Sequence, residues 1–196
     1  MSLEVVPIHK HPKYLNDCCK LINQEWTRSE GARMHSLTQS TDKLPTSLIL
    51  LKDKTVIGHV KLSIIPTVKT ACFLESLVID KALRGKGFGT VLMREAENFC
   101  RNLRLSTIFL STRGQEEFYA KLGYIECMPV SIYGGSVSIV CNSLPKKPVE
   151  NSTKNSNSIA DSRISLPPPP PPPLPFKQNN PATEQKSPKT YMKKDI

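Results

Sequence analysis

Residues 84–90, RGKGFGT, combine glycine and positive charge in a spacing that suits the binding of phosphate. They follow a stretch of large apolar residues, 73–79, and precede an amphipathic segment. Glycines let the backbone approach an anion closely, and the unpaired N–H groups and the dipole of a helix N-terminus attract negative charge. Arg84 and Lys86 add fixed positive charge beside the turn. We therefore predict a turn between a strand and a helix that binds a phosphorylated ligand.

Two familiar nucleotide-binding turns do not have this spacing. In a Rossmann unit, Gly-x-Gly-x-x-Gly is followed by an acidic residue at the end of a second strand. Here the spacing is Arg-x-x-Gly-x-Gly, and no such acidic residue follows. A Walker A loop closes on Gly-Lys and then Ser or Thr, which this turn does not contain. The turn therefore belongs to another class of phosphate-binding site.

Hydrophobic periodicity predicts the elements that would position this turn. After it, Phe88, Leu92, Ala96, Phe99 and Leu103 fall on one helical face. We expect further helices at 14–26 and 115–121, a short helix or loop at 26–41, a short extended segment at 5–9, and strands at 46–51, 55–65, 71–79, 105–110, 124–125 and 137–140. The strand at 105–110 reads as buried on both faces. This order predicts a mixed, mostly antiparallel α/β sheet flanked by helices, not a repeating βαβ array.

The composition divides the chain near residue 144. Twelve of the 17 prolines lie beyond it, including the run LPPPPPPPLP at 166–175. Residues 1–144 are long enough to bury a core, and we expect 145–196 to be a disordered tail whose proline run adopts polyproline II. The net charge of +10 is shared equally between the two parts. A folded part that is only modestly basic gives weak support for a nucleic-acid ligand and fits a phosphorylated or acidic ligand at least as well.

The six cysteines show neither a Cys-x-x-Cys pair nor a zinc-type spacing with histidine. Most lie in apolar runs, where a free thiol acts as a small core residue. No signal peptide precedes the predicted fold, and no run of about 20 apolar residues could cross a membrane. We therefore expect a monomeric cytosolic protein that has no metal site and binds no membrane.

Three features in order resemble the GCN5-related N-acetyltransferase (GNAT) superfamily across roughly residues 3–143. They are the strand ending in Leu77-Val78-Ile79, the turn Arg84-x-x-Gly87-x-Gly89 opening a helix, and the motif FYAKLGY at 118–124. The resemblance implies the GNAT fold and the cosubstrate acetyl-CoA. It implies that backbone amides of the turn hold the cosubstrate's diphosphate, that edge amides of the strand hold its acetyl carbonyl and pantetheine, and that the tyrosine lies beside the sulfur.

The same resemblance assigns the cofactor-binding residues. They are Leu77, Val78, Ile79, Arg84, Gly85, Lys86, Gly87, Phe88, Gly89, Thr90, Thr112 and Gln115. Two of these depart from the superfamily pattern, because Thr112 stands where many members have Asn and Gln115 replaces a usual alanine. A threonine hydroxyl can donate a similar hydrogen bond with less reach, and the glutamine can add a polar contact.

A narrower resemblance is carried by LINQEWTRSEGARMHSLTQS at 21–40, by ALRGKGFG at 82–89, and by the proline-rich tail. These segments are similar to the N-alpha-acetyltransferases that act on processed actin. The implied acceptor is the exposed acidic N-terminus of actin, Asp or Glu. Two other functions stay open: a GNAT enzyme acting on lysine or a small amine, and a polyproline adaptor whose domain only binds coenzyme A.

Acetyl transfer needs a base for the amine and an acid for the departing thiolate. Glu75 is the candidate base, because strand alternation would give it the same face as Leu77, although a solvated strand glutamate is an equal alternative. Tyr119 is the candidate acid, and a core aromatic residue is its alternative. An acidic acceptor also calls for cationic and hydrogen-bonding walls. The candidate substrate-binding residues are Trp26, Arg28, Arg33, Met34, His35 and Ser36, and their alternative is a scattered basic surface.

The proline run at 166–175 is a candidate ligand for a second protein. A long polyproline II segment is a preformed, low-entropy partner for an aromatic groove. Profilin, SH3 and WW domains bind such segments, and profilin suits an actin substrate because it carries monomeric actin. The alternative is a plain spacer.

Overall fold

The structure is a computed structural model that describes residues 2–132 and 188–196. The described residues belong to one compact unit. Its elements are β1 (Leu3–Pro7), η1 (Ile8–Lys10), η2 (Pro12–Tyr14), α1 (Leu15–Glu25), α2 (Glu30–Thr38), β2 (Thr46–Lys52), β3 (Thr55–Ile64), β4 (Ala71–Ile79), η3 (Lys81–Leu83), α3 (Phe88–Asn102), β5 (Thr107–Thr112), α4 (Glu116–Lys121), β6 (Ile125–Glu126) and β7 (Thr190–Asp195). The predicted strand at 137–140 and the proline run at 166–175 lie outside the described residues.

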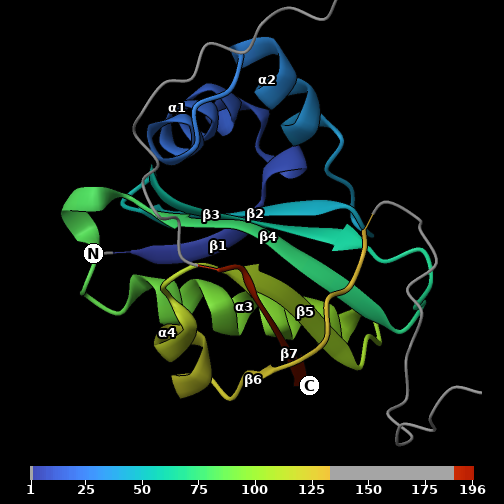
Figure 1. Ribbon diagram of the computed structural model, residues 1–196. Helices are drawn as coiled ribbons and strands as arrows, with labels where there is room; N and C mark the ends of the chain where they lie inside the picture. Colours follow the sequence, from blue (N-terminus) through green and yellow to red (C-terminus); the bar gives the residue numbers. More distant parts are fainter. Residues whose placement is uncertain (1, 133–187) are drawn as a thin grey trace, which may run out of the picture. The chain divides into compact units, whose positions relative to one another are not determined.

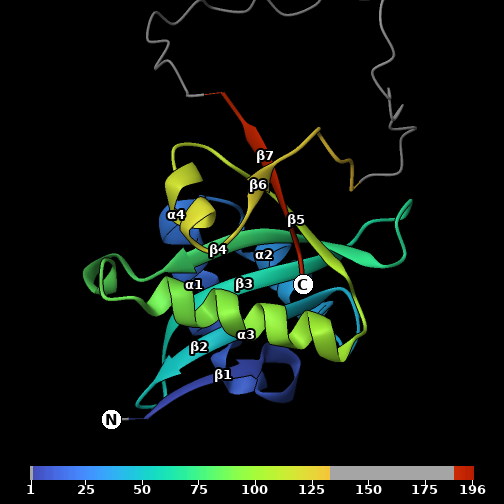
Figure 2. The same cartoon turned by 90° about the horizontal axis from the view of Figure 1, so that it is seen from below.

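One seven-stranded sheet organises the fold, in the order β1-β2-β3-β4-β5-β7-β6. Every neighbouring pair is antiparallel except β4 and β5, which are parallel. Figure 1 shows α1 and α2 on one face of the sheet and α3 and α4 on the other, and Figure 2 shows α3 running across the second face. The predicted mixed, mostly antiparallel sheet flanked by helices is therefore confirmed.

Both faces of the sheet bury apolar side chains, so the strands are sandwiched between helices. Helix α3 packs on one face, where Leu92 and Ala96 of the predicted stripe are buried with Met93 and Cys100 against β2, β3, β4 and β5. Helices α1 and α2 cover the other face with a second cluster that includes Ile22 and Leu37. None of the helices within residues 2–132 is long and apolar enough to cross a membrane.

Strand β5 is covered on one face only, which corrects the expectation that it is buried on both. Its burial alternates: Ile108, Leu110 and Thr112 are buried, and the residues between them are half-buried. The reason is its place in the sheet, because α1 packs over β3 and β4. On the other face Phe109 joins only a small cluster with Phe73 and Tyr191.

Strand β7 corrects the expectation that residues 145–196 form a disordered tail. It inserts between β5 and β6, pairing antiparallel with both. Met192 is buried in the main core, and the Lys194 Nζ donates to both oxygens of the buried Glu97 carboxylate on α3 at 2.8 Å. The segment has few apolar residues, and it forms a strand because β5 offers it an open edge and α3 offers it a partner for its charge.

The parallel strands β4 and β5 pair only at their beginnings. Their register runs from Ala71 with Thr107 to Leu74 with Leu110, yet β4 continues to Ile79 and β5 to Thr112. Within residues 2–132 and 188–196, the edge of β4 from 75 to 79 that faces β5 therefore has no strand partner. Diverging strands of this kind leave room for a ligand and leave backbone groups to bind it.

Candidate active site

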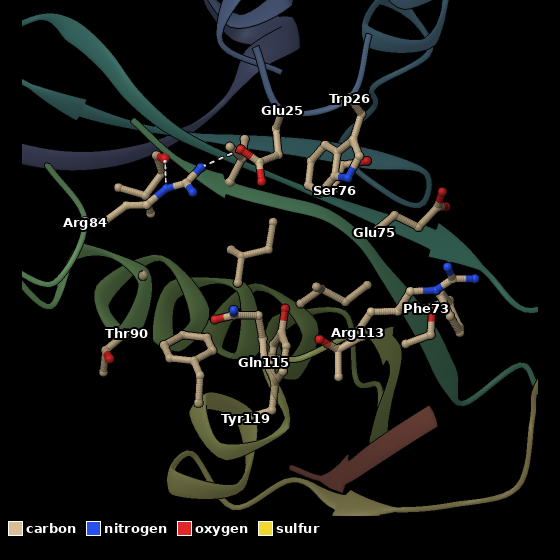
Figure 3. Close-up of a pocket in the computed structure, with 18 of the residues that line it drawn as sticks. Glu25, Trp26, Phe73, Glu75, Ser76, Arg84, Thr90, Arg113, Gln115 and Tyr119 are labelled. Atoms are coloured by element: carbon tan, nitrogen blue, oxygen red, sulfur yellow. Dashed lines mark hydrogen bonds and ion pairs between the residues drawn. The ribbon is translucent and has the colours of Figure 1, made fainter. Parts of the chain in front are cut away.

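A cavity of about 1060 Å³ opens where β4 and β5 diverge (Figure 3). Its walls come from the end of α1, from β4, from the glycine turn, from the end of β5 and from α4. It gathers most of the predicted site: Trp26, Glu75, Leu77, Val78, Ile79, Arg84, Gly85, Gly87, Phe88, Gly89, Thr90, Thr112, Gln115 and Tyr119. The predicted residues that do not line it are Arg28, Arg33, Met34, His35, Ser36 and Lys86. Motifs far apart in the sequence therefore share one cavity of a size typical of ligand sites.

The glycine turn presents bare backbone to the cavity. Gly85 and Gly87 have φ of +75° and +81°, which disfavours other residues, and a Cβ at either would meet no atom within 4 Å. Gly87 is the N-cap of α3, and no side chain caps this helix. The first N–H groups of the helix are thus left for a ligand. The turn fits the diphosphate that the sequence predicts for it.

Arg84, predicted as a cofactor contact, lines the cavity and is also held by two protein partners. Its Nε donates to the carbonyl oxygen of Ile79 at 3.0 Å, and its Nη2 contacts the Glu25 carboxylate at 2.7 Å. The guanidinium therefore fastens the turn to the end of β4 and to the end of α1, as the dashed lines in Figure 3 mark. Glu25 balances the charge of Arg84, so the backbone N–H groups of the turn and Lys86 remain to attract an anion.

The tyrosine motif reaches the glycine turn through close packing. A Cβ at Gly89 would lie 3.3 Å from the Phe118 ring, so the first turn of α3 rests directly on α4. Tyr119 follows Phe118, its side chain is nearly buried at 8% exposure, and Figure 3 shows its hydroxyl pointing into the cavity. Burial raises the pKa of Tyr119 to about 12. Its phenol is therefore a proton donor at neutral pH.

A β-bulge in β4 decides where Glu75 points. Lys61 pairs with Glu75 and His59 with Val78, so β4 holds one extra residue, and Ser76 has a φ of +54°. The expectation that Glu75 and Leu77 share a face is wrong, because the bulge breaks the alternation between them. Leu77 packs toward the core beneath α3, whereas the Glu75 carboxylate accepts a hydrogen bond from the Ser63 hydroxyl. Glu75 still lines the cavity, from the face that α1 and α2 cover.

The polar segment after α1 does not line the cavity as predicted, apart from Trp26, which is 45% exposed. Arg33 is buried: its Nε donates to Asn23 Oδ1 at 3.1 Å and its Nη2 to the Trp26 carbonyl at 2.7 Å. It clamps α2 to the end of α1. Met34 packs into the cluster beneath the two helices, and Ser36 accepts from Lys61 Nζ at 3.3 Å. Arg28 and His35 are exposed.

Several lining residues have no sequence-based prediction. Glu25 and Arg113 come one residue from predicted ones, and Lys189 and Tyr191 come from the supposed tail. Arg113 could have been found from its place after a strand that ends at the site. Lys189 could not, because the strand that follows it is too polar to be identified from its pattern. Within the described residues, no group of three His, Cys, Asp or Glu side chains could hold a metal ion.

His59 supports the bulge from the neighbouring strand and makes stability depend on pH. It is 1% exposed, its Nδ1 donates to the Ser76 carbonyl at 3.1 Å, and its Nε2 has no partner among the described residues. Burial lowers the pKa of His59 to about 4 from its usual 6.5, and the charges of Arg33 and Lys61 act in the same direction. The unfolded chain therefore takes up this proton below pH 6.5 and the folded protein does not until about pH 4.

We expect the free energy of unfolding to fall as the pH is lowered through this window. Linkage gives a loss of roughly 1.5 kcal/mol between pH 7.5 and 5.5 from this group. Urea unfolding at the two pH values measures it. His59→Gln keeps a donor for the Ser76 carbonyl and removes the titration, so the loss should shrink by about that amount. An unchanged loss in the variant would mean that His59 does not carry the effect.

The sequence of this chain is similar to those of known acetyltransferases. Residues 15–124 match the acetyltransferase (GNAT) family. N-alpha-acetyltransferase 80 of Mus musculus is 38% identical over 120 residues, which are 58% of this chain and 38% of the mouse protein. The match thus spans well under half the length of that relative.

Two solved structures show how far the likeness of the fold extends. An aminoglycoside 6'-N-acetyltransferase complexed with coenzyme A is 16% identical with a TM-score of 0.57, covering 65% of this chain and 87% of the other. The PaiA N-acetyltransferase of Thermoplasma acidophilum, in complex with coenzyme A, is 20% identical with a TM-score of 0.52, covering 64% of this chain and 91% of the other. At these identities the likeness is one of fold.

Proposed function

Because the chain belongs to the GNAT acetyltransferase family, we propose that it transfers an acetyl group from acetyl-CoA to the N-terminal amine of a protein. The likeness to a mouse N-alpha-acetyltransferase supports an N-terminal amine as the acceptor. The observation that carries the proposal is the cavity between the diverging strands, which joins the uncapped N-terminus of α3 to Tyr119. A diphosphate site and a proton donor in one cavity are what this reaction requires.

The backbone does most of the binding. Amides of residues 85–90 would hold the diphosphate, with Thr112 and Gln115 as polar contacts on the opposite wall. Acetyl-CoA supplies the acetyl group as an activated thioester. The free edge of β4 at 75–79 would donate N–H groups to the acetyl carbonyl oxygen, where negative charge develops during attack.

Two side chains would move protons on opposite faces of the sheet. Glu75 would accept a proton from the ammonium group of the acceptor, directly or through water, since its carboxylate lines the cavity on the α1 side. Tyr119 would donate its proton to the departing sulfur from the α4 side. The acceptor and the cosubstrate would thus meet between β4 and β5, so transfer occurs directly in a ternary complex.

We propose an acidic N-terminus, as on processed actin, as the acceptor. The support is the narrow sequence resemblance together with positive side chains in the cavity. Peptides beginning Asp-Asp-Asp and Met-Asp, and a peptide with an internal lysine and a blocked N-terminus, separate the classes of acceptor. We expect kcat/KM for the first to exceed the others by about tenfold or more. A preference for the internal lysine would favour the lysine-acetyltransferase alternative, and turnover of none of them would favour the adaptor.

The proline run is proposed to deliver the substrate by binding profilin that carries actin. Residues 130–132 and Lys189, which flank the chain segment containing the run, both line the cavity. A partner bound to the run would therefore be tethered close to the site, which raises the effective concentration of its N-terminus.

Deletion of residues 166–175 tests this tether. We expect kcat/KM for profilin-bound actin to fall about 10-fold or more, because binding in trans replaces tethering. The acetylation of a free acidic peptide should not change. Replacing the same ten residues by Gly and Ser is the matched control for length. Equal activity of the deleted and intact proteins on profilin-bound actin would leave the run as a plain spacer.

A further inference from the structure

Two cations of the cavity wall have no counter-charge. Arg84, Arg113 and Lys189 are the positively charged residues that line the cavity, and Arg84 is paired with Glu25. Arg113 and Lys189 are both exposed, and neither has a carboxylate within 4 Å among the described residues. Their positive charge is therefore available to a ligand.

These two cations come directly after the last paired residues of neighbouring strands. Thr112 of β5 pairs with Thr190 of β7, so Arg113 and Lys189 are the next residues along, just beyond the paired ends. Like charges opposite each other on neighbouring strands destabilise a sheet. The nearby carboxylate of Glu116 already accepts hydrogen bonds, among them one from the Gly114 N–H at 3.0 Å. Bonds from its own backbone N–H, from the Gly114 N–H and from the Thr190 hydroxyl lower the pKa of Glu116. An anion from outside would relieve the repulsion.

Strand alternation puts both side chains on the face of the sheet that is opposite α3. Leu110 of β5 and Met192 of β7 point into the core beneath α3. Tyr191, which alternates with Met192, packs with Phe73 on the other face, and the Lys189 Nζ lies 4.9 Å from the centroid of the Tyr191 ring. Glu75 and Trp26 line the cavity from this same face. The N-terminus of α3, where a diphosphate would bind, is on the opposite one.

We propose that Arg113 and Lys189 bind the acidic side chains of the acceptor next to its N-terminal amine and so set the preference for acidic N-termini. The inference rests on the proposed function and identifies the residues that determine the specificity for the acceptor. The Arg113 guanidinium can hold a carboxylate with two parallel hydrogen bonds, and Lys189 adds a second charge. The sequence assigned the same task to Arg28, Arg33 and His35, which do not line the cavity.

Replacing both cations by glutamine tests the assignment on a peptide beginning Asp-Asp-Asp and on the same peptide with Asn-Asn-Asn. For Arg113→Gln/Lys189→Gln we expect the KM of the Asp peptide to rise about 10- to 100-fold with kcat nearly unchanged. The rise corresponds to the binding free energy lost with the charge-assisted hydrogen bonds to the peptide. The KM of the Asn peptide should stay the same. The rise of KM with added salt for the Asp peptide should weaken in the variant.

A matched control removes the same two charges elsewhere. Arg94 and Lys121 are exposed on α3 and α4 and do not line the cavity. Arg94→Gln/Lys121→Gln should keep the wild-type KM for both peptides. Reversal of charge gives the complementary test: Arg113→Glu/Lys189→Glu should lower the KM of a peptide with lysines in place of the second and third Asp, relative to the wild-type protein.

Binding measurements separate the ways in which this idea can fail. Anisotropy of an Asp-Asp-Asp peptide labelled at its C-terminus should report weaker binding to the glutamine variant, while calorimetry gives an unchanged Kd for acetyl-CoA. Loss of acetyl-CoA affinity instead would assign the pair to the cosubstrate and overturn the inference. A wild-type preference for Asp that persists in the variant would overturn it too. Equal use of both peptides by the wild-type protein would refute the acidic acceptor itself.

Discussion

Tyr119→Phe is expected to lower kcat by roughly 10²- to 10³-fold, the usual contribution of a positioned general acid, and to leave the Kd of acetyl-CoA nearly unchanged. The phenol lies almost buried on α4 with its hydroxyl in the cavity. Since burial raises its pKa to about 12, the group stays protonated at the pH of the reaction and can donate to the departing sulfur. A discontinuous assay of the released coenzyme A thiol measures kcat, and calorimetry measures the Kd of acetyl-CoA.

The pH dependence of the defect distinguishes proton donation from packing. A free thiolate becomes more stable in water as the pH approaches the pKa of a thiol, about 8.5 for a cysteine side chain. Protonation by Tyr119 should then matter less, so the ratio of wild-type to variant kcat should shrink between pH 7 and 9.5. A purely structural defect would keep the ratio constant.

Tyr124→Phe is the matched control. Tyr124 packs against Tyr119 with ring centroids 5.9 Å apart, is buried, and does not line the cavity. The Tyr124→Phe protein should keep the wild-type kcat. A Tyr119→Phe protein with kcat within twofold of the wild-type value would remove Tyr119 from the chemistry.

The elements that could be predicted are those whose own sequence is sufficient to specify them. The apolar strand at 71–79 matches β4 residue for residue. Of the predicted stripe of α3, Leu92 and Ala96 are buried and Phe88 and Phe99 pack partly against the core. The glycine turn between them was recognisable because its residue types are required by its backbone angles. In each case the local pattern and the tertiary packing agree.

The features that could not be predicted depend on contacts distant in sequence. The bulge at Ser76 has no sequence signature, and the hydrogen bond from His59 that supports it comes from another strand. The sequence indicates that Arg84 is near the phosphate site but not that its Nη2 pairs with Glu25 at 2.7 Å. Arg33 similarly matched the chemistry of substrate binding, but burial and two hydrogen bonds occupy it. Charged residues are assigned correctly only when their partners are known.

The last strand is the extreme case, and it leads to the largest expected change in stability. Ending the chain at Pro188 removes β7, which would leave the edge of β5 unpaired, an opening beneath α3 where Met192 was buried, and the Glu97 carboxylate without Lys194. Breaking a buried ion pair costs about 3–5 kcal/mol, and losing a buried methionine costs a similar amount. Their sum approaches the total stability of a domain, about 5–15 kcal/mol.

We therefore expect the protein ended at Pro188 to be unfolded or aggregated, as judged by its far-UV circular dichroism and by size-exclusion chromatography. Deleting residues 141–180 instead removes far more of the chain and keeps β7, so this variant should unfold cooperatively near the wild-type Tm. If 189–196 were part of a disordered tail, both variants would melt alike. Lys194→Ala gives a smaller, graded effect, with an expected loss of about 1.5–3 kcal/mol, because the buried Glu97 carboxylate loses its 2.8 Å contact with Lys194 and keeps only Arg101 at 3.5 Å. That order of stability would establish that the sheet is completed by residues that lie beyond the proline run.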